Sequence, residues 1–219
     1  MDSPMNVRRL FSIAAVCGAV LSCADTTAPN RTNLYEWRLV VQTDTLSFHW
    51  PTSSLPVRIW VEDSLDMPTH IRDGITAWRS AFLYGEYDAI VVSDSSAADV
   101  LVRVASAPPL SPASAGRLLT MFPGCQGATD IDTAATRFQL QLPVRMYLTP
   151  KYDPALVDLT ECFRITATHE LGHSLGLFRH TSDTLDIMYV LPKAQVLSAR
   201  DINTAQVLSH WPANMTPTR

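Results

Sequence analysis

Apolar residues follow two different periods along the central part of the chain, and these periods predict both strands and helices. Short apolar runs rich in β-branched residues are typical of buried strands, and they occupy residues 57–61, 89–92, 100–104 and 144–148. A helix is predicted after Pro68, where apolar residues recur at helical spacing: Ile71, Ile75, Trp78 and Phe82. Two further helix starts are marked by residues spaced as capping boxes: Asp158 with Glu161, and Ser198 with Asp201. The order strand, helix, strand, strand predicts an α/β (α+β) fold with a twisted, mostly parallel sheet and a helix on one face.

Three regions carry a weaker signal. Residues 37–50 contain two short strand-like runs, which could form a small hairpin or a short pro-segment, and the pattern leaves both open. Residues 116–122 follow a loop rich in proline, serine and alanine and form another strand-like run. Residues 125–141 are treated as an insertion of unknown shape. Asp130 and Asp132 in this insertion could touch calcium, but two carboxylates without further ligands favour a solvated loop.

Length and composition narrow the class of protein. At 219 residues, with 47% hydrophobic and 17% charged residues, the chain suits one globular domain preceded by a short leader. We place that domain at residues 51–219 and expect it to be a monomer. The formal net charge is −4 and the sequence has no basic stripe, so nucleic acid is not expected as a partner.

The first residues have the pattern of an export signal. Two arginines precede an apolar run at residues 10–21 that is too short to span a bilayer, so residues 1–22 are predicted to be a signal peptide. Cys23 ends a lipobox-like Val-Leu-Ser-Cys sequence, which predicts lipidation and a membrane anchor on the periplasmic or cell-surface side. Cleavage after Ala24 is the alternative and would give a secreted protein. Residues 23–50 are then a lipid-anchored tether or a short pro-segment.

Cys125 and Cys162 are the cysteines that remain once the leader and Cys23 are set aside. An even pair in an exported protein predicts a disulfide. In the chain-entropy model a bridge across a loop of this length stabilises the fold by about 4 kcal/mol. Two buried free thiols are the alternative.

His169, Glu170 and His173 form a His-Glu-x-x-His motif. Two histidines four positions apart on a helix differ by about 40° around its axis, so both imidazoles leave the same face and can bind one metal ion. The carboxylate of Glu170 is placed beside them to take a proton from a metal-bound water. Gly176 allows the helix to end and the chain to turn back, because glycine adopts positive φ without steric cost. That turn can carry a third histidine to the same metal ion.

The stretch that runs from this motif to Met188 and Tyr189 resembles the metzincin metallopeptidases, and it is most similar to their matrixin branch. The resemblance implies one catalytic zinc ion, with Glu170 as the general base and Met188 in a methionine turn beneath the metal. The zinc ligands implied by the resemblance are His169, His173 and His180.

One position departs from the family pattern. Arg179 stands where the family places its third histidine, and His180 follows one residue later. The extra residue falls in an irregular turn, where an insertion is tolerated better than inside a helix. Asp183 and Asp186 are the reserve ligands, because carboxylates also bind zinc.

The resemblance covers roughly residues 51–211, although it is specific only for residues 169–189. It implies a five-stranded, mostly parallel sheet with an antiparallel edge strand, a backing helix, an active-site helix, a methionine turn and a C-terminal helix. Residues 116–122 would be the edge strand that lines the substrate cleft, and residues 189–193 one wall of the pocket beside the scissile bond. The second zinc of animal matrixins is not carried over, because this chain lacks the extra histidines that the site needs between His70 and His169. Calcium is possible but unsupported by the sequence.

These features predict a zinc-dependent endopeptidase that acts on a peptide or protein substrate. A catalytically inert zinc-binding surface lipoprotein, acting as a binding or structural module, is the alternative, and the displaced His180 would favour it. Glu170 argues against this alternative, because no structural zinc site requires a carboxylate base. The remaining histidines are predicted to be surface or capping residues: His49, His70 and His210.

Overall fold

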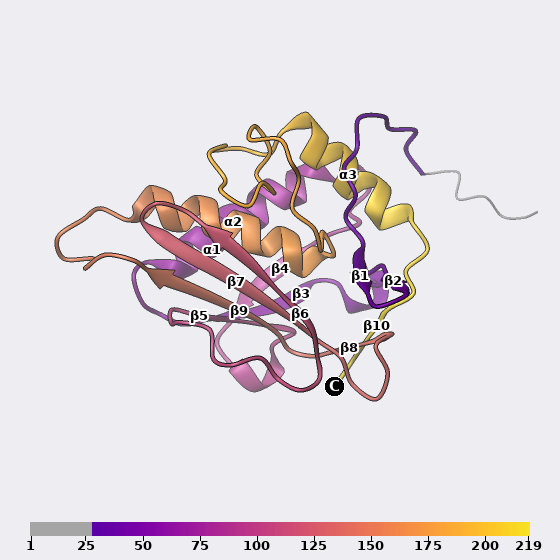
Figure 1. Ribbon diagram of the computed structural model, residues 1–219, viewed down its shortest axis with the longest axis horizontal. Helices are drawn as coiled ribbons and strands as arrows, with labels where there is room; N and C mark the ends of the chain where they lie inside the picture. Colours follow the sequence, from indigo (N-terminus) through magenta and orange to yellow (C-terminus); the bar gives the residue numbers. More distant parts are fainter. Residues whose placement is uncertain (1–27) are drawn as a thin grey trace, which may run out of the picture.

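The computed structural model describes residues 28–219, so the predicted signal peptide and Cys23 lie outside the described residues. This part of the chain has an α+β fold with three α-helices and a mixed six-stranded main sheet, which confirms the predicted mixture of helices and sheet. The helices gather on one side of the sheet (Figure 1). Within residues 28–219, no helix has both the length and the apolar character that a membrane span requires.

The main sheet has the strand order β4-β3-β5-β9-β7-β6. Its strands are β3 (Val57–Val61), β4 (Ala89–Val92), β5 (Val100–Arg103), β6 (Ser114–Met121), β7 (Cys125–Asp132) and β9 (Val144–Pro150). The pairs β3–β4, β3–β5 and β5–β9 are parallel, whereas β7 runs antiparallel to both β9 and β6. Residues 116–121 therefore fall in the edge strand β6, which is antiparallel to its neighbour β7. Because β7 is also antiparallel to β9, β6 runs in the same direction as the parallel strands, and the strand that opposes them is β7 rather than the predicted edge strand.

The sheet has six strands rather than the expected five, because β7 forms from residues whose shape the sequence did not predict. Asp130 and Asp132 lie on β7 and are each 5% exposed, so the prediction of a solvated loop is wrong. Each carboxylate is paired with an arginine of a neighbouring strand, Asp130 with Arg117 at 2.5 Å and Asp132 with Arg145 at 2.6 Å. These ion pairs offset the cost of burying the carboxylates, which therefore do not require calcium.

The helices α1 (Met67–Ala81) and α2 (Thr160–Leu175) pack against each other over the sheet, and α3 (Ala199–His210) follows near the C-terminus. The predicted apolar face of α1 is buried: Ile71, Ile75 and Trp78. Trp78 also donates its indole N–H to the carbonyl of Thr168 at 2.8 Å. This bond joins α1 to α2 directly before His169 and so fixes the helix that carries the His-Glu-x-x-His motif.

The capping box predicted for α3 is present. The Ser198 hydroxyl accepts from the N–H of Asp201 at 3.0 Å, and the Asp201 carboxylate accepts from the N–H of Ser198 at 2.9 Å. The box predicted for α2 is wrong. Asp158 accepts from the N–H two residues on at 2.9 Å, but Glu161 accepts from the side chain of Gln195 at 2.6 Å rather than turning back to the helix start.

Residues 37–50 contain the hairpin that the sequence allowed, in which β1 (Leu39–Val41) pairs antiparallel with β2 (Asp44–Leu46). This segment and the residues just before it contribute large side chains to the main core: Tyr35, Trp37, Leu46, Phe48 and Trp50. The C-terminal tail holds the hairpin in place, because the N–H of Ser47 donates to the side chain of Asn214 at 2.8 Å. The hairpin is thus packed together with residues 51–219.

The tail continues as β10 (Thr216–Thr218), which pairs parallel with β8 (Gln139–Gln141) and brings Arg219 to the main sheet. There Asp99 accepts hydrogen bonds from Arg58 at 2.9 Å and Arg219 at 2.6 Å. Burial alone would raise the pKa of Asp99, but the bonds from Arg58 and Arg219 outweigh it and hold this pKa below its usual value.

We expect Asp99→Asn to lower the free energy of unfolding by about 1 kcal/mol at pH 7, since both arginines are partly exposed and water weakens the ion pairs. A carboxylate with a depressed pKa in the folded state stabilises the fold above its unfolded pKa of about 3.9. That contribution is lost as the pH falls through the folded-state pKa. Urea unfolding at pH 7 and at pH about 3 should therefore show a difference between wild type and variant that shrinks in acid. A difference that grows in acid would contradict this assignment.

Candidate metal centre

The helix α2 carries His169 and His173 on one face, and both side chains are fully buried. Their Nε2 atoms are 3.0 Å apart. The helix ends at Gly176, whose φ of 115° lies in the left-handed region that glycine adopts without steric cost. A Cβ atom at this position would lie 2.0 Å from the carbonyl oxygen of Phe48, so the close approach of the hairpin segment requires glycine as well. The chain turns back from this point toward the two histidines.

His180 reaches the same point in spite of the extra residue Arg179. Its Nε2 atom is 3.2 Å from that of His173, and the ligand atoms of the three histidines all lie within 4.8 Å of one another. Nitrogen atoms bound to one tetrahedral zinc ion at roughly 2.0–2.1 Å would be about 3.3 Å apart. The three histidines are therefore close enough to bind one metal ion.

Two backbone carbonyls set the orientation of the buried imidazoles. The Nδ1–H of His169 donates to the carbonyl of Ile187, and the Nδ1–H of His173 donates to that of Leu177, both at 2.6 Å. Because a carbonyl can only accept, the proton of each ring stays on Nδ1 and the Nε2 lone pairs face the common point. Such a convergence of lone pairs is favourable only with a cation between them. Imidazole nitrogen binds zinc, copper, iron and nickel, so the donor set does not identify the metal.

Burial keeps these imidazoles neutral. It lowers the pKa of His169 to about 3 and that of His180 to about 4, and it holds the pKa of His173 well below the usual value. Only the neutral form of histidine has a lone pair for a metal ion. At neutral pH the three side chains are therefore in the form that binds a metal.

Glu170 is fully buried next to the ligands and lies against the sheet. The hydroxyl of Thr129 on β7 donates to its Oε2 at 2.5 Å, whereas Oε1 has no hydrogen-bond partner among the described residues. Burial raises the pKa of Glu170 to about 8, and the bond from Thr129 opposes this shift. Burial therefore disfavours the charged carboxylate unless a cation lies nearby, and the bond from Thr129 holds the group in place through Oε2.

Met188 packs beneath α2 and is fully buried. A Cβ atom at Gly172 would lie 2.4 Å from the Met188 sulfur, so the methionine fits closely against the helix between the two histidines. The N–H of Thr181 donates to the carbonyl of Met188 at 3.0 Å, and Thr181 forms an isolated parallel bridge with Tyr189. The methionine segment and the His180 segment are therefore joined along their backbones.

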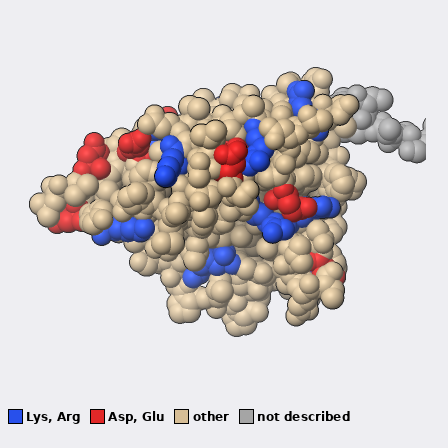
Figure 2. Space-filling view, turned by 45° about the horizontal axis from the view of Figure 1, so that its top comes forward, with Lys and Arg blue, Asp and Glu red and all other residues tan. Residues whose placement is uncertain are grey.

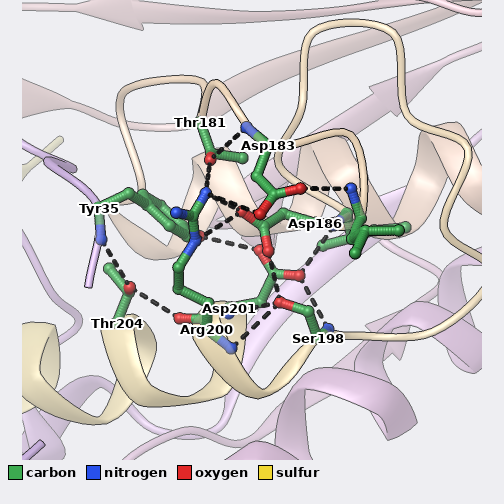
Figure 3. A network of polar contacts seen from close by, with 10 residues as sticks. Tyr35, Thr181, Asp183, Asp186, Ser198, Arg200, Asp201 and Thr204 are labelled. Carbon is green, nitrogen blue, oxygen red and sulfur yellow. Dashed lines mark hydrogen bonds and ion pairs between the residues drawn. The ribbon is translucent and has the colours of Figure 1, made fainter. Parts of the chain in front are cut away.

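The reserve ligands lie in a different group of contacts (Figure 3). Asp186 is 1% exposed and accepts hydrogen bonds from Arg200 at 2.9 Å and from Ser198 at 2.6 Å. Asp183 lies 4.0 Å from Arg200 and accepts from the N–H of Leu185. Neither carboxylate belongs to the group that could hold a metal ion. Arg200 also donates to the hydroxyl of Thr181, next to His180. Asp183 and Asp186 therefore do not act as ligands, but through Arg200 they help to hold the segment that carries His180.

Cys125 and Cys162 are joined by a disulfide, which links the start of β7 to the first turn of α2. The bond fixes the strand that holds Glu170 to the helix that carries it.

The sequence did not point to Thr129 or Arg200 as site residues, because their partners are distant along the chain and no local motif marks them. The sequence also placed His70 at the surface or at a helix cap, but it is 4% exposed and packs beside Phe163, so this prediction is wrong. Within residues 28–219, the histidines that are grouped closely enough to hold a metal ion are His169, His173 and His180.

We expect His180→Ala to lower metal affinity at least about 100-fold, since loss of a ligand should exceed the 10- to 100-fold loss seen for its outer-shell partners. Competition with a chelator measures the effect. His210→Ala is the control, because His210 lies 3.0 Å from Glu86 rather than at the metal centre. If the variant kept wild-type affinity, His180 would not be a ligand.

No protein-family model matches the chain, and a search of curated proteins finds no match.

Proposed function

We propose that the chain is a zinc-dependent endopeptidase, similar to the matrixin branch of the metzincins, that hydrolyses bonds in a peptide or protein substrate. The observation that carries this proposal is the position of Glu170, a buried carboxylate between two of three histidines whose Nε2 atoms converge. A purely structural zinc site needs ligands but no such carboxylate. We assign the catalytic domain to residues 51–219.

A zinc ion held by the three Nε2 atoms would polarise the scissile carbonyl and make the attacking water more acidic. Glu170 accepts the proton of that water and then gives it to the leaving amine, as general base and general acid in turn. The bond from Thr129 to Oε2 holds the carboxylate in place for this role. Ile187 and Leu177 keep the protons of the two helical histidines on Nδ1, which leaves their Nε2 atoms available as ligands.

The substrate is proposed to bind as an extended strand along β6, since an edge strand offers unpaired backbone groups to an added chain. The N–H of Met121, at the end of β6, donates to the carbonyl of Val190 at 3.0 Å, so the edge adjoins the segment that follows Met188. A largely apolar pocket of about 340 Å³ opens there, lined by Met121, Phe122, Pro123, Lys151, Leu191, Pro192 and Lys193. We propose that it takes an apolar substrate side chain.

The remaining proposals, on partners and location, are based on the charge distribution at the surface and on the predicted signal peptide. Basic and acidic residues are interspersed on the face shown in Figure 2, and this mixture does not favour nucleic acid as a partner. We propose an exported monomer, anchored to a membrane surface through lipidation of Cys23.

The inert zinc-binding lipoprotein would gain support from a distorted ligand set, but the 3.2 Å separation between the Nε2 atoms of His173 and His180 does not favour it. Zinc content and cleavage of a broad peptide library by the wild-type chain test the proposal. We expect one zinc ion per chain and cleavage that stops with a chelator and returns with added zinc. A zinc-loaded protein that cleaves no peptide in the library would instead support the inert lipoprotein.

A further inference from the structure

The loop that carries His180 is held by a segment far away in sequence. Residues 35–50, which we call the N-terminal clamp, lie beside the end of α2 and beside α3 (Figure 1). Four aromatic residues of the clamp are less than one-tenth exposed: Tyr35, Trp37, Phe48 and Trp50. Each of them contacts the helix end, the ligand loop or the residues that support that loop.

The clamp fixes the point where the chain leaves α2. The indole N–H of Trp50 donates to the carbonyl of Ser174 at 3.0 Å. The carbonyl oxygen of Phe48 lies so close to Gly176 that no side chain fits there. The start of the loop is therefore set by the clamp as well as by the helix.

The same segment anchors Phe178 inside the loop. The backbone N–H of Phe178 donates to the carbonyl of Trp37 at 2.7 Å, and its ring stacks on that of Phe48 with centroids 6.3 Å apart. Only Arg179 separates this anchored residue from His180. The conformational freedom that the extra residue could introduce is thus confined to a single position.

On the far side of His180, the clamp reaches the support of the next segment through Tyr35 (Figure 3). Its hydroxyl donates to Oδ1 of Asp201 at 3.1 Å, and Oδ2 of Asp201 accepts the N–H of Ile187 at 2.8 Å. The carbonyl of Ile187 in turn accepts the Nδ1–H of His169. Tyr35 also lies under the guanidinium of Arg200, 5.7 Å from its ring centre, and Arg200 holds Thr181. Both sides of the third ligand are therefore connected to the clamp.

We propose that the N-terminal clamp positions His180 and remains part of the functioning protein, so that residues 35–50 belong to the metal centre and are not a removable pro-segment. This inference rests on the metal site of the proposed function, but not on catalysis. Asp44, the acidic residue in the hairpin, pairs with Arg137 at 3.0 Å rather than with the histidines, so it does not block the site. The clamp supports the ligand loop from behind, and its loss should loosen metal binding rather than open a closed site.

The test compares two conservative changes of equal size in the otherwise complete chain. Phe48→Leu shortens a ring that is 1% exposed and packs on the ligand loop, whereas Phe163→Leu shortens one that is 2% exposed and packs beside His70. We expect Phe48→Leu to weaken zinc binding about 10-fold in competition with a chelator, as for other outer-shell changes. It should also alter the visible absorption of the cobalt-substituted protein, which reports the number of bound ligands. The control should stay within about twofold of wild type for zinc and keep its cobalt spectrum, although it lowers the stability of the metal-free protein similarly.

A second variant covers the case in which Phe48→Leu fails to fold. Trp50→Phe keeps an aromatic ring but removes the N–H that bonds to Ser174, and it should weaken zinc binding in the same direction. The proposal is overturned if both clamp variants bind zinc like wild type, if Phe163→Leu weakens binding as much as Phe48→Leu, or if cleavage after residue 50 leaves a protein that binds zinc as tightly as before. A wild-type protein that binds zinc but cleaves no peptide would overturn the proposed function and leave this inference intact.

Discussion

Replacing Glu170 with glutamine is expected to lower kcat/KM for peptide cleavage by about 10²- to 10⁴-fold while zinc binding is retained. Glutamine has nearly the same shape and can still accept the bond from Thr129, so the packing around the carboxylate site should survive. It cannot take a proton from water at neutral pH, and the general-base step is lost. Steady-state cleavage of one defined peptide, with zinc content measured on the same samples, gives both numbers.

The control for this prediction lies on the same helix. Glu161→Gln changes the same chemical group in the exposed first turn of α2, where the carboxylate accepts a bond from Gln195. Its kcat/KM should stay within about twofold of wild type, because surface substitutions have small effects. Equal activity of Glu170→Gln and wild type would rule out Glu170 as the base. Loss of zinc from Glu170→Gln would show that the residue supports the site rather than the reaction.

The parts of this centre that the sequence predicted are those that depend on local geometry. The spacing of His169 and His173 places both on one face of any α-helix, and Gly176 marks the position where that helix can end and turn. The strands at residues 57–61, 89–92 and 100–104 consist largely of apolar, β-branched residues, and a short run of this kind is typical of a strand. In each case the residue type and a short repeat were enough to predict the element.

The parts of the fold and of the site that the sequence did not predict depend on contacts between residues that are distant along the chain. β7 contains Thr129, Asp130 and Asp132, and polar residues of this kind give no apolar alternation. The cost of burying them is offset by Glu170, which accepts from Thr129, and by two arginines of neighbouring strands, which pair with the two aspartates. The role of residues 35–50 was open for a similar reason, since the contacts that fix this segment are made to α2 and α3 far along the chain.

Removing the disulfide with the double variant Cys125→Ala, Cys162→Ala is expected to lower the free energy of unfolding by about 4 kcal/mol. The two cysteines are 37 positions apart, and the bond restricts this long loop in the unfolded chain. For a domain of this size, such a loss should lower the melting temperature by roughly 10 °C. Urea unfolding and calorimetry of the oxidised wild type and the variant measure the change.

The same samples can also test whether the disulfide acts only on the unfolded chain or also holds the folded metal centre together. Cys125 begins β7 and Cys162 lies in the first turn of α2, so the bond ties together the two elements that hold Thr129 and Glu170. If the disulfide acts only through the unfolded chain, reduced wild type and the double variant should be equally destabilised relative to the oxidised protein. Both should then keep the kcat/KM of the oxidised protein at low temperature. If it also holds β7 against α2, kcat/KM should fall in both reduced forms well below the melting temperature, with zinc content unchanged. A double variant whose free energy of unfolding fell by less than about 1 kcal/mol would contradict the loop-entropy argument itself.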